Sequence, residues 1–126
     1  MTTRFCILIV DDDEQSLDIY DELFRQEGYT VIKARDGVEA LDRFTKCPAD
    51  LVIVDLMMPR LNGLEFCARF RRNPNARSVP ILVLTGLNEP ETRQKALQYG
   101  ASDFLAKPYT AAVLLERVRA LLAARK

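Results

Sequence analysis

The chain contains no histidine, and it has only three cysteines among its 126 residues, Cys6, Cys47 and Cys67. Without histidine and without a CxxC pair, the usual ligands of a zinc site are missing, and acid–base catalysis by histidine is excluded. The cysteines are odd in number and widely spaced, which is typical of a reduced, cytoplasmic protein rather than one held by disulfides. We expect them to be packing residues rather than redox centres.

The chain also lacks an excess of charge and a long apolar run. Eighteen basic residues balance eighteen acidic ones, so electrostatics give no argument for binding to nucleic acid or to an anionic membrane. The first apolar stretch, FCILIV at residues 5–10, is too short for a signal peptide or a membrane span. Because 48% of the residues are hydrophobic, we expect one folded domain over residues 1–126.

Short apolar runs that favour strands alternate with longer stretches of helical periodicity. Strands are expected at residues 5–10, 30–34, 51–54, 81–84 and 103–106, and helices at 14–27, 37–46, 63–72, 90–99 and 110–124. Three of the runs are continuous Ile, Val and Leu, which is typical of parallel strands covered on both faces. The run at 30–34 contains Lys33 and is expected at an edge. The pattern predicts an α/β domain with a parallel sheet.

Polar residues follow four of these runs. Asp11 and Asp12 follow the first, Asp55 the third, Thr85 the fourth and Lys107 the fifth. Because parallel strands all point the same way, these side chains should gather at the carboxyl edge of the sheet, where open α/β sheets bind ligands. For the strand order 2-1-3-4-5, the binding crevice lies between the first and third strands. We therefore expect the three aspartates to share one crevice.

Three carboxylates and one lysine leave a net charge of −2, which a divalent cation would cancel. Oxygen ligands select a hard ion, magnesium or calcium. A half-open site with two or three carboxylates and room for water suits Mg²⁺, whereas Ca²⁺ would require more protein oxygens, and the chain has no EF-hand loop. The sequence therefore predicts a Mg²⁺ site.

Structural explanations exist for each of these residues taken singly. Asp12 with Gln15 fits a helix capping box, and Asp13 fits a solvated acid in the first helical turn. Thr85 is compatible with an ordinary strand residue and Lys107 with a surface charge. These explanations do not account for polar residues at four strand ends at once, and we therefore favour a functional site.

Four segments together carry a family resemblance: IVDDD at 9–13, VDLMMPRLNG at 54–63, VLTG at 83–86 and GASDFLAKP at 100–108. In order and spacing they resemble the receiver domain of two-component response regulators, over essentially the whole chain. The resemblance implies a doubly wound, flavodoxin-like fold, with a five-stranded parallel sheet of order 2-1-3-4-5 and five flanking helices.

The resemblance also implies roles for the metal and acceptor residues. Asp11 and Asp12 match the acidic pair that holds Mg²⁺, and Asp55 matches the phosphoacceptor, which also contacts the metal. The backbone carbonyl of Met57 matches a further metal ligand. A carboxylate is a suitable nucleophile for phosphorus, and phosphoryl transfer needs mainly positioning and charge stabilisation.

The remaining implied roles concern the phosphoryl group and the switch. Thr85 matches the hydroxyl that binds the phosphoryl group, and Lys107 matches the lysine that pairs with it. Phe104 matches the aromatic switch residue, coupled to Thr85, and the Lys107–Pro108 bond matches one that is usually cis in the family. Phosphorylation would then change the partners of the face made by the fourth helix, fifth strand and fifth helix.

The implied partners are a sensor histidine kinase or a histidine phosphotransfer protein as phosphoryl donor, together with a phosphatase. The chain would catalyse its own phosphorylation and dephosphorylation, so it would be an enzyme only in a narrow sense. No direct binding to nucleic acid or membrane is expected. Whether the domain acts alone or precedes an output domain is left open.

Three alternatives differ in what they require of the sequence. A receiver-like docking module that is not regulated by phosphorylation would lack some of the acidic or lysine positions, and this chain keeps them all. A dehalogenase-type phosphatase would have a second acid two residues after the nucleophile, where this chain has Met57. A flavin-binding flavodoxin would share the topology but give no reason for the acidic cluster.

Overall fold

The computed structural model describes residues 4–56, 62–86 and 90–125. The strands are β1 (Cys6–Val10), β2 (Thr30–Ala34), β3 (Leu51–Asp55), β4 (Ile81–Thr85) and β5 (Asp103–Ala106). The helices are α1 (Glu14–Gln26), α2 (Gly37–Lys46), α3 (Gly63–Phe70), the short 3₁₀ helix η1 (Pro74–Ala76), α4 (Pro90–Gln98) and α5 (Ala111–Arg125). All ten predicted elements are present, with ends within two residues of those expected.

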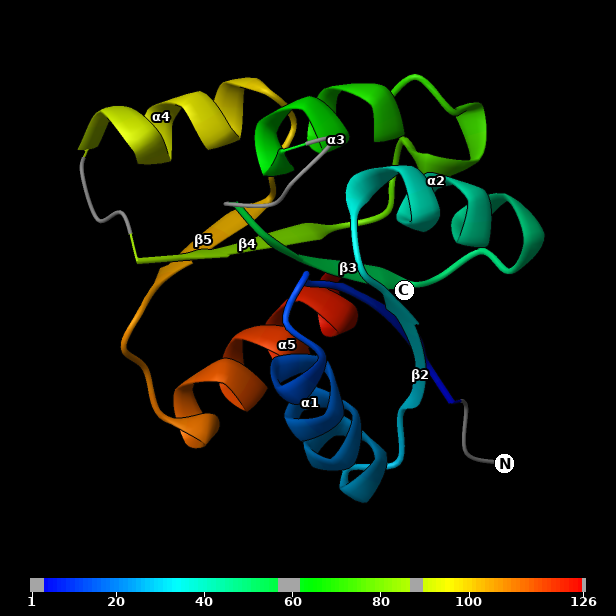
Figure 1. Ribbon diagram of the computed structural model, residues 1–126, viewed down its shortest axis with the longest axis vertical. Helices are drawn as coiled ribbons and strands as arrows, with labels where there is room; N and C mark the ends of the chain where they lie inside the picture. Colours follow the sequence, from blue (N-terminus) through cyan, green and yellow to red (C-terminus); the bar gives the residue numbers. More distant parts are fainter. Residues whose placement is uncertain (1–3, 57–61, 87–89, 126) are drawn as a thin grey trace.

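The five strands form one parallel sheet in the order β2-β1-β3-β4-β5. The predicted fold class is confirmed, and β2, with Lys33, lies at an edge as expected. Helices α2, α3 and α4 cover one face of the sheet, and α1 and α5 cover the other (Figure 1). The strand order reverses between β1 and β3, and the carboxyl ends of these two strands are where open α/β sheets bind ligands; we call this place the crevice.

The core has two parts, one on each face of the sheet. Alternate residues of a strand point to opposite faces, so Leu8 and Val10 of β1 pack on the α2–α4 side while Ile7 and Ile9 pack on the α1–α5 side. All four are at most 1% exposed. This double burial is why the central strands read as continuous apolar runs in the sequence.

Arg71, at the start of the connection between α3 and β4, has a structural role. Its guanidinium donates hydrogen bonds to the carbonyl oxygens of Ala76 at 2.7 Å and Gly100 at 2.8 Å, and also to the carbonyl of Val79. The ring of Phe70 lies 5.9 Å from the guanidinium carbon. Arg71 thus joins the α3–β4 connection to the α4–β5 turn at the amino ends of β4 and β5.

Within the described residues, every helix is too short or too polar to cross a membrane.

Candidate functional site

The crevice between β1 and β3 brings Asp11 and Asp55 to one place. Val10 pairs with Val54 in the sheet, so the aspartates that follow lie at neighbouring strand ends, as the sequence predicted. Asp11 is only 4% exposed, and its Oδ1 accepts a hydrogen bond from the amide of Asp13 at 3.0 Å. Burial, reinforced by the charges of Asp55 and Asp12, raises the pKa of Asp11 to about 6, although the Asp13 amide and Lys107 oppose this rise.

The three consecutive aspartates have three different environments. Asp11 is buried, whereas Asp12 is exposed beside it. Asp13 is the N-cap of α1: its carboxylate accepts the amide of Gln15 at 3.2 Å and the hydroxyl of Ser16 at 2.9 Å. The suggestion that Asp12 caps this helix was therefore wrong. The Asp13 amide donates to the side chain of Asp11, and this local turn places Asp13, one residue further along, at the N-cap position. Asp12 is left free of a capping role.

Lys107 faces Asp55 directly. Its Nζ donates a hydrogen bond to Asp55 Oδ2 at 3.0 Å, and the Asp55 side chain is only 14% exposed. Burial alone would lower the pKa of Lys107, but its hydrogen bond to Asp55 and the charge of that carboxylate outweigh burial, so the pKa is raised. The Lys107–Pro108 peptide is cis, as the resemblance implied. The lysine therefore remains a cation next to the proposed acceptor.

Thr85 and Phe104 lie on the two strands beyond β3. Thr85 ends β4 and is fully buried, and its carbonyl accepts the Lys107 amide at 2.7 Å. Phe104 in β5 is 5% exposed and packs in the core on the α2–α4 side. The structure thus brings Asp11, Asp55, Thr85 and Lys107 to the carboxyl edge. Met57, the remaining predicted ligand, lies outside the described residues.

Gly63 explains one part of the VDLMMPRLNG segment. A Cβ at this position would lie 2.7 Å from the Cα of Leu56 and 2.9 Å from the carbonyl oxygen of Asp55, which is too close for any residue but glycine. Asn62 caps α3 by accepting the amide of Glu65 at 3.0 Å. Together the two residues start α3 directly against the end of β3, and this packing holds Asp55 at the edge of the crevice.

A pair of tyrosines next to the crevice was missed in the sequence. The hydroxyl oxygens of Tyr20, on α1, and Tyr109, in the β5–α5 loop, lie 2.5 Å apart. Burial and the bond to Tyr20 raise the pKa of the Tyr109 hydroxyl, and the negative charges of Asp11 and Asp55 raise it further. The only signal in the sequence was the position of Tyr109, two residues after Lys107, since nothing in the spacing links it to Tyr20.

The residues at the crevice fit a hard divalent cation. Within the described ranges, no three side chains of the His, Cys, Asp or Glu types converge on one metal-sized position. Mg²⁺ does not require such a cage, because it keeps several waters and is usually held by one or two carboxylates. Burial is the main cause of the raised pKa of Asp11, and the nearby charges of Asp55 and Asp12, which a cation would balance, raise it further. The donor set consists of oxygen atoms, as Mg²⁺ prefers.

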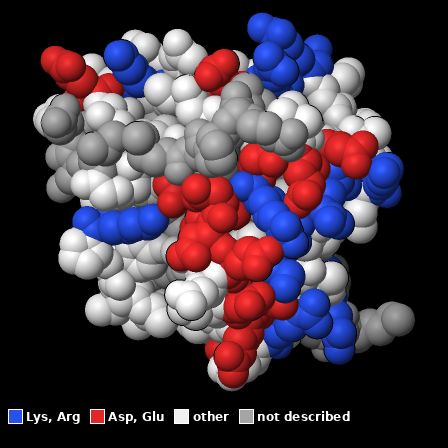
Figure 2. Space-filling view, in the orientation of Figure 1, with Lys and Arg blue, Asp and Glu red and all other residues white. Residues whose placement is uncertain are grey.

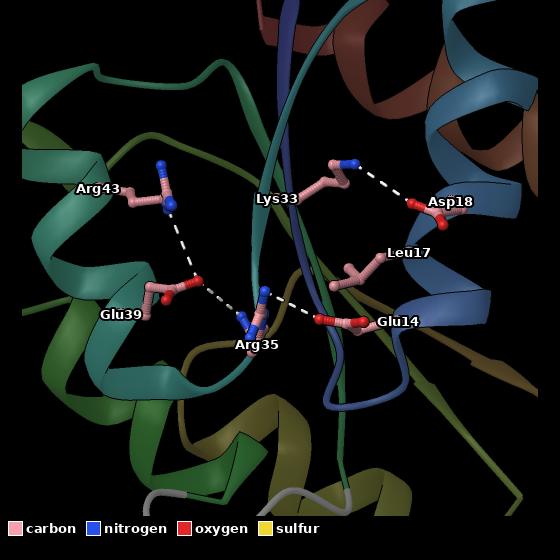
Figure 3. A pocket seen from close by; sticks show the side chains of 7 residues that line it. All are labelled: Glu14, Leu17, Asp18, Lys33, Arg35, Glu39 and Arg43. Atoms are coloured by element: carbon pink, nitrogen blue, oxygen red, sulfur yellow. Dashed lines mark hydrogen bonds and ion pairs between the residues drawn. The ribbon is translucent and has the colours of Figure 1, made fainter.

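A second charged region lies over α1, β2 and α2 (Figure 2). There a hollow of about 280 Å³ separates the two helices, and Figure 3 shows the side chains that line it. Arg35 lies 2.8 Å from Glu14, and Lys33 lies 3.3 Å from Asp18, measured between the charged atoms. Because its cations and anions face one another, the hollow has the character of a surface ion-pair network, and we assign it no chemistry.

Comparison with known proteins identifies the class of protein that this sheet and crevice belong to. The family model of the response regulator receiver domain matches residues 7–119. The chain therefore belongs to the receiver domains of two-component response regulators.

Individual relatives agree with this assignment. The response regulator MprA of Mycobacterium sp. (strain KMS) is 44% identical over 116 residues, which cover 92% of this chain and 50% of that protein. The chain thus spans about half the length of the curated relatives it matches. Among solved structures, the chemotaxis protein CheY4 of Vibrio cholerae has a TM-score of 0.91 at 32% identity, covering 94% of this chain and 99% of that one. The Francisella response regulator 1452 receiver domain has a TM-score of 0.90 at 28% identity, covering 98% and 100%.

Proposed function

We propose that Asp55 accepts a phosphoryl group in a Mg²⁺-dependent reaction, from a phosphohistidine on a sensor kinase or on a histidine phosphotransfer protein. The observation that carries this proposal is the contact at 3.0 Å between Lys107 Nζ and a largely buried Asp55 carboxylate, beside a second buried carboxylate, Asp11. Membership in the receiver family supports it. The proposed metal ligands are Asp11, Asp12, Asp55 and the backbone carbonyl of Met57.

The chemistry follows from the positions of the side chains. A carboxylate oxygen of Asp55 attacks phosphorus, and the bond from phosphorus to the donor nitrogen breaks in line. Lys107 already contacts Asp55, so its ammonium can move to a phosphoryl oxygen while staying in the crevice. The hydroxyl of Thr85 is assigned to another oxygen. When bound, Mg²⁺ would neutralise charge on the transferring group, and Asp11 and Asp12 would hold it there.

The proposed output is a change in the surface made by α4, β5 and α5. Thr85 would move toward the phosphorylated Asp55, and Phe104 would repack in response, which is a two-state population shift driven by a new charge. This surface carries the exposed apolar side chains of Leu97, Tyr99 and Val113. We assign the binding of downstream partners to it.

The proposed setting is the cytoplasm, with a sensor kinase upstream and a phosphatase that ends the signal. Residues 1–126 are proposed to act as one receiver domain. The competing proposal is a docking module with the same fold that is not regulated by phosphorylation, and the experiment that separates the two is labelling of Asp55.

Incubation with acetyl phosphate and Mg²⁺ should add one phosphoryl group, which intact-protein mass spectrometry detects. Asp55→Asn should abolish the adduct, because an amide is a poor nucleophile, whereas Asp42→Asn, at an exposed site on α2, should be labelled like the wild type. Removing Mg²⁺ with a chelator should also prevent labelling. Full labelling of Asp55→Asn would refute the acceptor assignment, and an unlabelled wild type would favour the docking module.

A further inference from the structure

Two of the three cysteines lie side by side, although they are 41 positions apart in the sequence. Cys6 is the first residue of β1, with its side chain on the α2–α4 face of the sheet, and Cys47 is the residue that ends α2. The Cys47 thiol is near enough to help raise the pKa of Cys6. Asp50 fixes this arrangement: its Oδ2 accepts the Cys6 amide at 2.8 Å, and its own amide donates to the Cys6 carbonyl at 2.8 Å. Cys47 precedes Asp50 by three residues, so it is held against the start of β1.

The two thiols differ in their access to solvent. Cys47 is exposed and borders a surface hollow of about 230 Å³ together with Ile32, Arg43 and Lys46. Cys6 is half-buried behind it. The third cysteine, Cys67, is fully buried on α3, and burial raises the pKa of its thiol to about 12. The chain therefore offers one accessible thiol with a neighbour in contact, and one inert thiol as an internal control.

We propose that Cys6 and Cys47 form a reversible dithiol–disulfide site that is oxidised by small disulfides of the glutathione class. A disulfide requires the sulfur atoms to come within about 2.05 Å of each other, and the exposed end of α2, which carries Cys47, is the part of the pair that can move to close this distance. This proposal is independent of the phosphoryl chemistry, because the pair lies at the amino ends of the strands and Asp55 lies at the carboxyl ends.

The reaction proceeds in two exchange steps. The exposed Cys47 loses its proton and attacks one sulfur of the small disulfide, which forms a mixed disulfide and releases one small thiolate. Cys6 then loses its proton and attacks the Cys47 sulfur, which forms the Cys6–Cys47 bond and releases the second small thiolate. The two protons from the protein thiols end on the two small thiols. The protein is oxidised by two electrons and the small disulfide is reduced by two.

The order of the steps follows from burial. Burial, together with the neighbouring Cys47 and Asp50, raises the pKa of Cys6 to about 11, so Cys6 is a poor first nucleophile. Once Cys47 carries the mixed disulfide, Cys6 is in contact with its target, and this proximity favours ring closure over release of the adduct. The closed loop also restricts the unfolded chain, so the oxidised protein should be more stable.

The experiment uses the whole chain incubated with oxidised glutathione, quenched with an alkylating reagent and analysed by mass. The expected product has lost the mass of two hydrogen atoms, contains a peptide from around Cys6 joined to one from around Cys47, and returns to the dithiol with dithiothreitol. Its unfolding temperature should be several degrees higher. A wild-type chain that stays reduced, or that keeps a stable glutathione adduct on Cys47, would overturn the proposal.

Three variants sharpen the result. Cys6→Ser should accumulate the glutathione adduct on Cys47, because the second step is blocked, and Cys47→Ser should remain unmodified at Cys6. Cys67→Ser should oxidise like the wild type, and a cross-link that depends on Cys67 would refute the pairing. Asp55→Asn should also oxidise like the wild type, so the outcome is separable from that of the phosphorylation experiment.

Discussion

Polar groups have different partners at the two ends of the parallel strands, the amino edge, where the strands begin, and the carboxyl edge, where they end. At the amino edge, one cation, Arg71, meets the neutral carbonyls of Ala76, Val79 and Gly100. At the carboxyl edge, burial raises the pKa of the Asp11 carboxyl, and the charges of Asp55 and Asp12 raise it further. Hydrogen bonds from a cation to neutral carbonyls stabilise a fold. A carboxylate that is buried near other carboxylates destabilises it. The difference supports the proposal that the carboxyl edge is a binding site, whereas the amino edge stabilises the fold.

At the amino edge, the side chain of Arg71 packs closely against the turn at Gly100. Its φ is +111°, a conformation that favours glycine, and a Cβ there would lie 2.7 Å from the Cγ of Arg71. The guanidinium lies against this turn and donates to the Gly100 carbonyl from both Nε, at 3.0 Å, and Nη2, at 2.8 Å. Such a forked contact needs the planar geometry of arginine.

The largest effect on stability is expected from Arg71→Met. This change keeps most of the apolar length of the side chain but leaves several partly buried carbonyls without their donor, so it should lower the free energy of unfolding by about 2–4 kcal/mol. Arg71→Lys should restore only part of the loss. Urea unfolding measures the difference, and Arg72→Met, at an exposed neighbouring position, is the matched control. Equal losses in Arg71→Met and Arg72→Met would show that the contacts at the amino edge do not determine stability.

At the carboxyl edge, removing a charge should raise the free energy of unfolding rather than lower it. The folded-state pKa of Asp11 is raised from 3.8 to about 6, so the folded state disfavours the charged form. This destabilisation is fully present above pH 6, shrinks as the pH falls toward 4, and is absent below the unfolded pKa. Asp11→Asn should therefore raise the free energy of unfolding by about 1–3 kcal/mol at pH 7.5 without Mg²⁺, with little effect near pH 3.5.

Adding Mg²⁺ should make the wild type more stable than Asp11→Asn. If Asp11 is a ligand, Mg²⁺ stabilises the wild type by mass action and stabilises Asp11→Asn much less. Unfolding with and without Mg²⁺ measures both terms, and Asp13→Asn is the control because asparagine also caps helices well. An Asp11→Asn variant that is no more stable than the wild type at pH 7.5 would mean that the charges of the crevice are already balanced.

Much of the carboxyl edge could be predicted because it depends on where strands stop. The apolar runs that end before Asp11, Asp55 and Thr85 are buried on both faces, so each run marks its strand end to within a residue. A parallel sheet then requires these ends to meet. The residue that caps a helix is harder to predict from the sequence, because Asp12 and Asp13 both fit an N-cap. The hydrogen bond from the Asp13 amide to the Asp11 side chain decides between them, and the sequence does not show it.

The contacts of Arg71, Tyr20 and Cys47 could not be predicted in the same way. Each depends on the direction of a side chain across two or more elements that are distant in the sequence, and periodicity carries no such information. Arg71 reaches Gly100 over 29 positions, and Tyr20 reaches Tyr109 over 89. In a sequence, Arg71 reads as one of many surface charges and Tyr20 as one of several core residues on α1.

The smallest effect is expected from the tyrosine pair that borders the crevice. Tyr20→Phe and Tyr109→Phe each remove the same hydrogen bond, and both side chains are half-buried, so water replaces part of the lost contact. Each variant should lose about 0.5–1 kcal/mol of unfolding free energy. Because the bond joins α1 to the loop that carries Lys107, each should also change the rate of labelling by acetyl phosphate by about twofold, or about 0.4 kcal/mol in the barrier.

A double-mutant cycle tests whether the two hydroxyls act together. If they do, the double variant should be no less stable than the worse single variant, because the bond is lost only once. Tyr99→Phe, at an exposed site after α4, is the control and should change neither stability nor labelling. Losses that simply add in the double variant would show that each hydroxyl contributes alone, and that the carboxyl edge is held to α1 by packing rather than by this bond.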